Sequence, residues 1–140
     1  MAYDQDNIFA RIIRGEIPCH RVYEDADTIA FMDIMPQADG HALVVPKSAG
    51  EDIYSTSPDA AAAAMRTAQI IARAVKKAFA PPGIMIAQLN GAAAGQSVFH
   101  LHIHVIPRYA GKDLGIHAAK PADPAVLAAH AARIRAALPP

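Results

Sequence analysis

Apolar side chains recur at helical spacing in three stretches of the chain. In the first, Asp6 or Asn7 can cap a short helix that Gly15 allows to end. In the second, the run Ser57-Pro58-Asp59 supplies a cap, a first-turn proline and an acid, and it predicts a long helix that ends at APPG, residues 80–83. A third, alanine-rich helix is expected from about residue 123 to 138. The side chains expected to face the interior are Ile8, Phe9, Ile12 and Ile13 in the first helix and Met65, Ala68, Ala72, Val75 and Phe79 in the second.

Five shorter apolar runs predict β-strands. They are HRVYED (residues 20–25), TIAFMDI (28–34), HALVVPK (41–47), IMIAQLN (84–90) and SVFHLHIHVIP (97–107). The first two are joined by the turn-forming Asp25-Ala26-Asp27, which predicts a hairpin. Runs of strands with short turns, flanked by helices, predict an α+β fold around a five-stranded antiparallel sheet.

Composition narrows the possible functions. The length of 140 residues fits one domain, and no internal repeat or long linker divides it. Thirteen Lys and Arg balance 13 Asp and Glu, so no general positive field attracts nucleic acid or an anionic membrane. The sequence has no secretory signal and no apolar stretch near the roughly 20 residues that span a bilayer, so we expect a cytoplasmic protein. Cys19 is the only cysteine, which excludes an internal disulfide.

Three of the seven histidines alternate with apolar residues in the last expected strand. Alternation places His100, His102 and His104 on one face, about 6–7 Å from one to the next, and turns Leu101 and Ile103 to the other face. Imidazoles need hydrogen-bond partners when buried, so they are poor core material. Three explanations compete: an exposed strand face, a metal site, and chemistry on a phosphate group.

Strand geometry limits the metal explanation. His100 and His104 lie roughly 13 Å apart along an extended strand, which is too far for all three imidazoles to reach one zinc ion at about 2 Å. At most a pair could bind, with His41 or another residue completing the ligand shell.

The loop before the strand favours phosphate chemistry. NGAAAGQS, residues 90–97, contains two glycines whose backbone N–H groups can approach a ligand closely. It also brings the polar side chains of Asn90, Gln96 and Ser97 next to the histidines. The combination predicts an anion cradle beside a histidine nucleophile.

HLHIHVI, residues 100–106, resembles the signature of the histidine triad (HIT) superfamily, in which three histidines alternate with apolar residues. NIFARIIRGEIP (7–18), AFMDIMPQADGHALVVPK (30–47) and NGAAAGQSVFHLHIHVIPR (90–108) resemble, in order and spacing, segments of its Hint-like branch of nucleotide hydrolases. The resemblance covers residues 7–110. It implies the HIT-like α+β fold, one HIT domain spanning residues 1–140, and a C-terminal extension that carries the third helix.

The resemblance also implies roles for individual residues. In such proteins the middle histidine, here His102, attacks the α-phosphate of a nucleotide conjugate and forms a nucleotidyl-histidine that water hydrolyses. His100 and His104 would position the nucleophile and contact the phosphate, and Ser97 would support the leaving group. The nucleotide-binding residues implied are Asp33, Ile34, Asn90, Gly95, Gln96, His41, Ile8, Phe9 and Ile12. Asp33 would hold the ribose hydroxyls and the last three would form an apolar wall against the base, although Asp33 could equally cap a turn and the other three could equally be core residues.

The activity implied is hydrolysis of purine nucleoside phosphoramidates, that is, of AMP or GMP conjugates. Imidazole is largely neutral near pH 7 and can attack phosphorus without a metal. Two alternatives stay open: dinucleoside polyphosphate hydrolysis, and a nucleotide-binding adaptor without significant turnover. Relatives are typically homodimers that pair their sheets, so the resemblance implies a homodimer.

One feature of the family is missing. Many bacterial members carry a Cys-x-x-Cys in the first helix that, with two histidines, binds a structural zinc. This chain has Asn7 and Ala10 at that spacing, so half of the ligand set is absent although His41 and His100 remain. We predict no metal and no cofactor.

Overall fold

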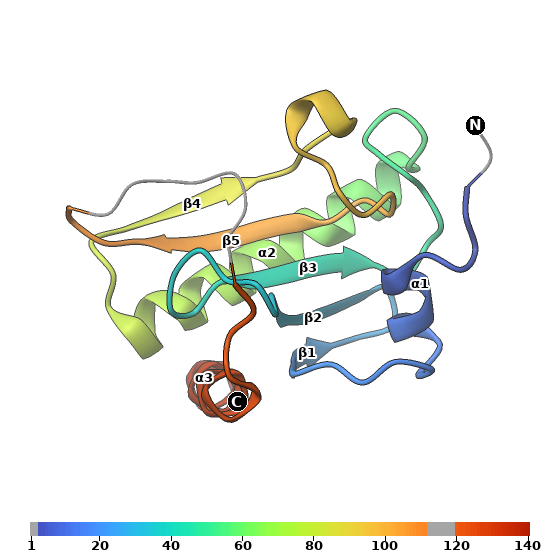
Figure 1. Cartoon of the computed structure of the whole chain (residues 1–140). Coiled ribbons are helices and arrows are strands. Elements are labelled where there is room, and N and C mark those ends of the chain that lie inside the picture. Colours follow the sequence, from blue (N-terminus) through green and yellow to red (C-terminus); the bar gives the residue numbers. More distant parts are fainter. Residues whose placement is uncertain (1–2, 112–119) are drawn as a thin grey trace.

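The computed structural model describes residues 3–111 and 120–140 of the chain. The elements in chain order are α1 (Ile8–Ile13), β1 (Arg21–Glu24), β2 (Thr28–Met32), β3 (Ala42–Pro46), α2 (Pro58–Phe79), β4 (Gly83–Ala87), the 3₁₀ turn η1 (Ala92–Ala94), β5 (Ile103–Arg108) and α3 (Pro124–Ala137). The strands form one antiparallel sheet in the order β1-β2-β3-β5-β4 (Figure 1). The expected α+β fold is confirmed.

The helices begin where the capping signals predict. Asn7 accepts a hydrogen bond from the N–H of Ala10, and Ser57 accepts one from the N–H of Ala60. Asp123 caps α3 in the same way. Within the described ranges, none of the helices combines the length and the apolar content needed to cross a membrane.

The two faces of the sheet pack against different helices. α2 and α3 cover one face, where Leu101, Ile103 and Val105 join the larger hydrophobic cluster (Figure 1). α1 covers part of the other face, where Phe9 and Ile12 pack with side chains of β2 and β3. Because side chains alternate along the chain, the histidines between these apolar residues face the α1 side.

Met65 does not face the interior as expected: it is 53% exposed. The buried stripe of α2 runs instead through Ala64, Ala68, Ile71 and Val75, which are spaced at three and four residues. A step of one residue turns a helix by about 100°, so Met65 lies well away from this stripe. Ile8, also expected to face inward, is 41% exposed because it lies at the rim of a pocket.

The last strand is shorter than expected, and His100 and His102 precede it. β5 pairs with β3 only from Ile103 onward. In the same register Leu101 would face Pro46, which has no N–H to donate, and the N–H of Leu101 bonds to the carbonyl of Gly50 instead. β4 likewise ends at Ala87, three residues before the expected end.

Candidate active site

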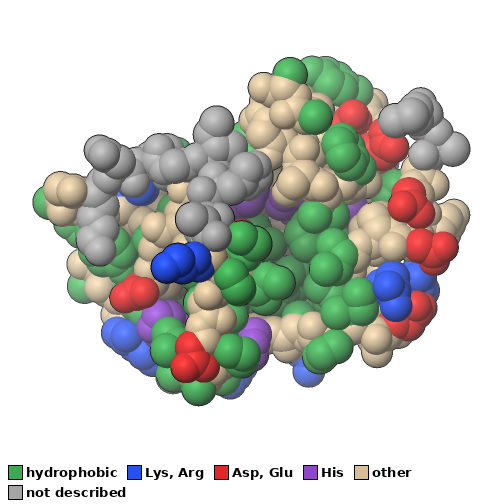
Figure 2. Space-filling view, in the orientation of Figure 1, with side chains coloured by type: hydrophobic (Ala, Val, Ile, Leu, Met, Phe, Trp, Pro, Cys, Tyr) green, Lys and Arg blue, Asp and Glu red, His purple; other side chains and the backbone are tan. Residues whose placement is uncertain are grey.

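A pocket of about 420 Å³ opens on the α1 side of the sheet. Histidine side chains are visible in a hollow bordered by apolar side chains (Figure 2). The sequence-derived site residues that line the pocket are Ile8, Phe9, Ile12, Asp33, Ile34, Ser97, His102 and His104. The lining residues that sequence reasoning missed are Ile17, Pro18, Cys19, Phe31, Met32, Met35, Leu43 and Val98. Phe31 and Leu43 lie opposite each other on paired strands, so strand alternation could have indicated them.

The other sequence-derived residues, which are His100, His41, Asn90, Gly95 and Gln96, are absent from the pocket lining. The carboxamide of Gln96 accepts from the N–H of Gly91 and donates to the carbonyls of Glu51 and Val98. Asn90 accepts from the N–H of Ile53. Gly95 adopts a left-handed conformation, φ 99°, at the end of η1. These three residues therefore shape the loop behind the pocket.

The anion cradle expected from the loop is not formed by its glycines. The N–H of Gly91 donates to the Gln96 side chain, and the N–H of Gly95 donates to the carbonyl of Ala92. A backbone donor that is already bonded inside its own loop cannot also hold a phosphate. The polar side chains that reach the pocket are those of Asp33, Ser97, His102 and His104.

His102 presents one ring nitrogen to the pocket. Its Nδ1 lies 2.7 Å from the carbonyl oxygen of His100, which can only accept a hydrogen bond. The proton of the neutral ring is therefore on Nδ1, and Nε2 keeps its lone pair. Burial lowers the pKa of His102, so the neutral ring persists to lower pH than for a free histidine. The ring of Phe9 packs edge-on against it at 4.8 Å.

His100 is buried behind His102, and both of its ring nitrogens have partners. Nε2 donates to the carbonyl of Pro46 at 2.7 Å, and Nδ1 faces the hydroxyl of Tyr3. The ring of His100 is therefore held by hydrogen bonds within the protein, and the backbone carbonyl of His100 orients His102.

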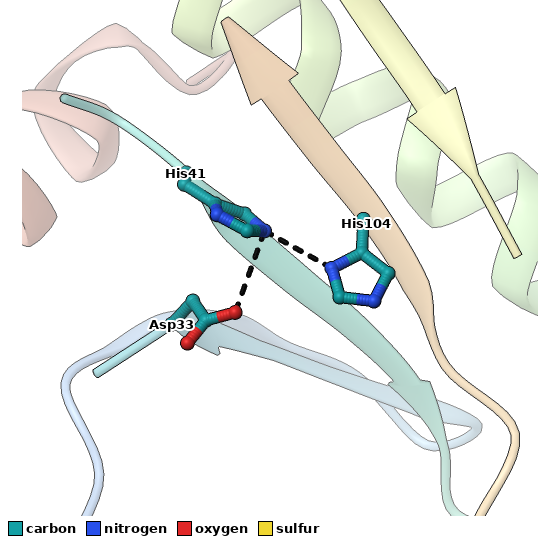
Figure 3. A group of neighbouring side chains, drawn as sticks. All are labelled: Asp33, His41 and His104. Atoms are coloured by element: carbon teal, nitrogen blue, oxygen red, sulfur yellow. Dashed lines mark hydrogen bonds and ion pairs between the residues drawn. The ribbon is translucent and has the colours of Figure 1, made fainter. Parts of the chain in front are cut away.

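His104 is linked to a second buried histidine. Nε2 of His41 lies 3.0 Å from Nδ1 of His104 and 3.4 Å from a carboxylate oxygen of Asp33 (Figure 3). The other ring nitrogen of His41 accepts a hydrogen bond from the backbone N–H of Gln37. A neutral His41 must therefore carry its proton on Nε2. Since two N–H groups cannot face each other, Nδ1 of His104 is unprotonated and accepts the hydrogen bond from His41. In the neutral ring the proton of His104 is therefore on Nε2.

Asp33 has two functions in the described geometry. One carboxylate oxygen accepts the N–H of Met35 and so caps the turn after β2, as the sequence allowed. The other faces His41, and the side chain also lines the pocket. The turn-capping interpretation and the pocket interpretation of Asp33 are thus compatible.

Asp33, His41 and His104 place ligand atoms within 4.8 Å of one another, a spacing that could hold a metal ion. The protonation of His41 argues against it, because Nδ1 already accepts the Gln37 N–H and Nε2 has no lone pair left to coordinate an ion. The two histidines considered for a zinc site, His41 and His100, bind different partners. We therefore keep the prediction that the protein has no resident metal.

Comparison with known proteins identifies the family to which this fold and these three histidines belong. A family model described as the HIT domain matches residues 14–111. The chain is 44% identical over 106 residues to Protein hit of Bacillus subtilis, covering 76% of this chain and 73% of that protein. It is 41% identical over 103 residues to adenylylsulfatase HINT3 of Arabidopsis thaliana, covering 74% and 52%. A crystal structure of a Hit-like protein from Bartonella henselae superposes with a TM-score of 0.91 at 49% identity, covering 98% of this chain and 100% of that one.

The chain belongs to the HIT family. The match confirms the resemblance inferred from the triad, and the similar proteins include one named as an adenylylsulfatase and one named as a histidine triad nucleotide-binding protein. The HIT match runs from the end of α1 to just after β5 and includes all four polar residues of the pocket. Tyr3 and α3 lie outside it.

Proposed function

We propose that this HIT protein hydrolyses phosphoramidates of purine nucleoside 5′-monophosphates through a covalent nucleotidyl intermediate on His102. The observation that carries the proposal is the unprotonated Nε2 of His102, a residue of the pocket lining. The hydrogen bond from Nδ1 to the carbonyl of His100 keeps the proton of the ring on Nδ1 and orients Nε2. We include a cytoplasmic location in the proposal, because a single cysteine and balanced charge fit that compartment.

The lining of the pocket supports a nucleotide as the ligand. The acidic Asp33 and the polar Ser97, His102 and His104 can meet the ribose hydroxyls and the phosphate. Most of the remaining lining is aliphatic or aromatic and can pack against a flat base. A purine buries more apolar area than a pyrimidine and so gains more binding free energy from this lining. Apolar contacts discriminate poorly between the polar edges of adenine and guanine. We expect kcat/KM values for AMP and GMP conjugates within about tenfold of each other.

The proposed reaction has two displacements at phosphorus. In the first, Nε2 of His102 forms a bond to phosphorus while the bond from phosphorus to the leaving amine breaks, and the amine takes up a proton. The hydroxyl of Ser97, which lines the pocket, can relay this proton to the amine from water. In the second, water attacks phosphorus, the bond to His102 breaks, and the proton that the attacking water releases replaces the one that the amine took up. The nucleoside monophosphate leaves and His102 is regenerated.

Substrate comparison tests the proposed activity. Wild-type protein in EDTA should hydrolyse adenosine 5′-phosphoramidate with a higher kcat/KM than diadenosine polyphosphates. A higher kcat/KM for the dinucleotides would favour the dinucleoside polyphosphate hydrolase. Tight binding of AMP with no turnover of either substrate would favour a nucleotide-binding adaptor. Loss of turnover on addition of EDTA would contradict the metal-free mechanism.

Cys19 offers a direct test of where the nucleotide binds. The only cysteine of the chain is half-buried in the pocket wall, and burial raises the pKa of its thiol, so it should react slowly with alkylating reagents. Saturating AMP should slow its alkylation at least about fivefold, because the bound base would cover the thiol. Phosphate at the same concentration is the control. Equal alkylation rates with and without bound AMP would show that the nucleotide lies elsewhere.

We also propose a homodimer that pairs the two sheets through β4. The strand order leaves β1 and β4 at the edges, and α3 covers β1, with Arg135 donating to the carbonyl of Arg21. Beside β4, the exposed Met65 and Ile86 line a shallow groove with three alanines, Arg66 and Gln69 of α2. Within the described residues β4 is an edge strand, and an edge strand next to a largely apolar groove suits pairing with a second copy.

Ile86→Asp should convert the dimer to a monomer, because it places a charge against an apolar partner surface. Light scattering at matched concentration measures this. Val126→Asp is the control, since Val126 is exposed to a similar degree on α3, away from β4. A wild-type protein that is monomeric throughout the concentration range would contradict the proposed dimer.

A further inference from the structure

Tyr3, which precedes α1 and lies outside the matched HIT segment, contacts the first histidine of the triad, His100. Its hydroxyl lies 2.5 Å from Nδ1 of His100, and its ring meets the imidazole edge-on at a centroid distance of 5.6 Å. His100 is 1% exposed, so its ring nitrogens depend on protein partners, and the Tyr3 hydroxyl is the partner of Nδ1. Tyr3 is not among the residues that line the pocket.

The direction of this hydrogen bond follows from its neighbours. Nε2 of His100 faces the carbonyl of Pro46, which can only accept, so the proton of the neutral ring is on Nε2. Nδ1 is then bare, and the Tyr3 hydroxyl must donate to it. A second tautomer, with the proton on Nδ1, would lose the bond to Pro46, because a carbonyl cannot donate to a bare Nε2, whereas the Tyr3 hydroxyl could accept from Nδ1. Tyr3 and Pro46 therefore hold the ring of His100 from its two sides.

Fixing this ring also fixes the adjacent backbone. The carbonyl of His100 accepts the hydrogen bond that places the proton of His102 on Nδ1. His100 lies outside β5, and the peptide group that carries this carbonyl is held on its other side by the bond from the Leu101 N–H to the carbonyl of Gly50. The side-chain anchors of His100 add a second constraint on the position of the carbonyl that orients the nucleophile.

The same N-terminal segment touches the triad a second time. The carbonyl of Asp4 accepts from both the backbone and the side chain of Asn7, which ties Tyr3 to the start of α1. Phe9, the second residue of α1, packs its ring against the imidazole of His102. Tyr3 and Phe9 thus contact two successive triad histidines from one short stretch of chain, which runs beside the end of β3 in Figure 1.

We propose that Tyr3 is a positioning residue for the nucleophile: its hydroxyl fixes the orientation of the His100 ring, and through the carbonyl of His100 it aligns Nε2 of His102. The inference rests on the proposed function for its kinetic consequence and on geometry alone for its effect on the two rings. A residue that only fastened the N-terminus would contribute to stability and leave the chemical step unchanged.

Tyr3→Phe tests this with the smallest change, because it removes the hydroxyl and keeps the ring contact with His100. The kcat for adenosine 5′-phosphoramidate should fall about tenfold, since a small misplacement of a nucleophile is costly. The KM and the Kd for AMP should stay within about twofold, because Tyr3 is not part of the pocket lining. Tyr54→Phe is the matched control, since Tyr54 is 82% exposed.

Nitrogen NMR of the histidine rings provides a readout that needs no turnover. In the wild type we expect His100 in the Nε2–H form and His102 in the Nδ1–H form, and in Tyr3→Phe we expect the ring signals of both to shift. Unchanged ring signals together with an unchanged kcat would overturn the proposal, as would a loss of thermal stability alone. If the wild type shows no turnover, the proposed function fails, and the ring signals still decide: a shift supports the positioning role and its absence overturns it.

Discussion

His102→Ala should lower the kcat for adenosine 5′-phosphoramidate by about 10,000-fold or more, because it removes the atom that attacks phosphorus. The change should leave AMP binding within about tenfold, since the rest of the pocket lining stays in place. Circular dichroism and a binding titration establish that the variant is folded and competent to bind, and a turnover assay measures the loss.

His20→Ala is the matched control for His102→Ala. His20 is half-buried, lies just before β1, and is absent from the pocket lining. Its loss should change kcat less than about threefold. A folded His102→Ala protein with more than a tenth of the wild-type kcat would show that another group attacks phosphorus.

Acidification should destabilise the fold steeply through His41. Burial first, and then the neighbouring His104 and His102, lower the pKa of His41 from 6.5 to about 3. In the unfolded chain this group takes up a proton below pH 6.5, whereas in the folded chain it stays neutral, so the stability it confers is complete above pH 6.5 and is lost as the pH falls toward 3. Between pH 6.5 and 4.5 the free energy of unfolding should fall by roughly 2–3 kcal/mol from His41 alone.

His41→Gln isolates this contribution. Urea unfolding at a series of pH values gives the free energy of unfolding at each pH. Between pH 4.5 and 6.5 this free energy should change less steeply with pH in the variant than in the wild type, whatever the variant's stability at neutral pH. Burial also lowers the pKa values of His100 and His102, so part of the acid sensitivity should remain in the variant. His20→Gln is the control for loss of one histidine. Equal slopes for wild type and His41→Gln would contradict a neutral, buried His41.

Local signals in the sequence predicted the type and order of the helices and strands, whereas the bounds of β4 and β5 differ from the expected ones. The caps at Asn7, Ser57 and Asp123 start their helices as expected, because each supplies an acceptor to an unpaired N–H of the first turn. The error at Met65 arose because the alanine-rich α2 carries two overlapping apolar stripes, and only packing against the sheet decides which one is buried. The single HIT domain over residues 1–140 stays a prediction.

The candidate site was predictable in part. Motif resemblance named all four polar residues that line the pocket, but it could not distinguish residues that reach the pocket from residues that hold others in place. Gln96 and His100 look like ligand contacts in the motif, and in the structure their polar atoms bond within the protein. Tyr3 lacked any local signal, because its contact with His100 joins residues 97 positions apart.

The stereochemical course at phosphorus tests the nucleophilic role of His102 most directly. A single diastereomer of adenosine 5′-phosphoramidothioate, hydrolysed in water enriched in the heavy oxygen isotope, yields a thiophosphate whose configuration can be assigned by phosphorus NMR. Each in-line displacement inverts the phosphorus centre, so two displacements through a nucleotidyl-His102 intermediate predict net retention. Net inversion would mean that water attacks the substrate directly, and it would contradict the covalent mechanism.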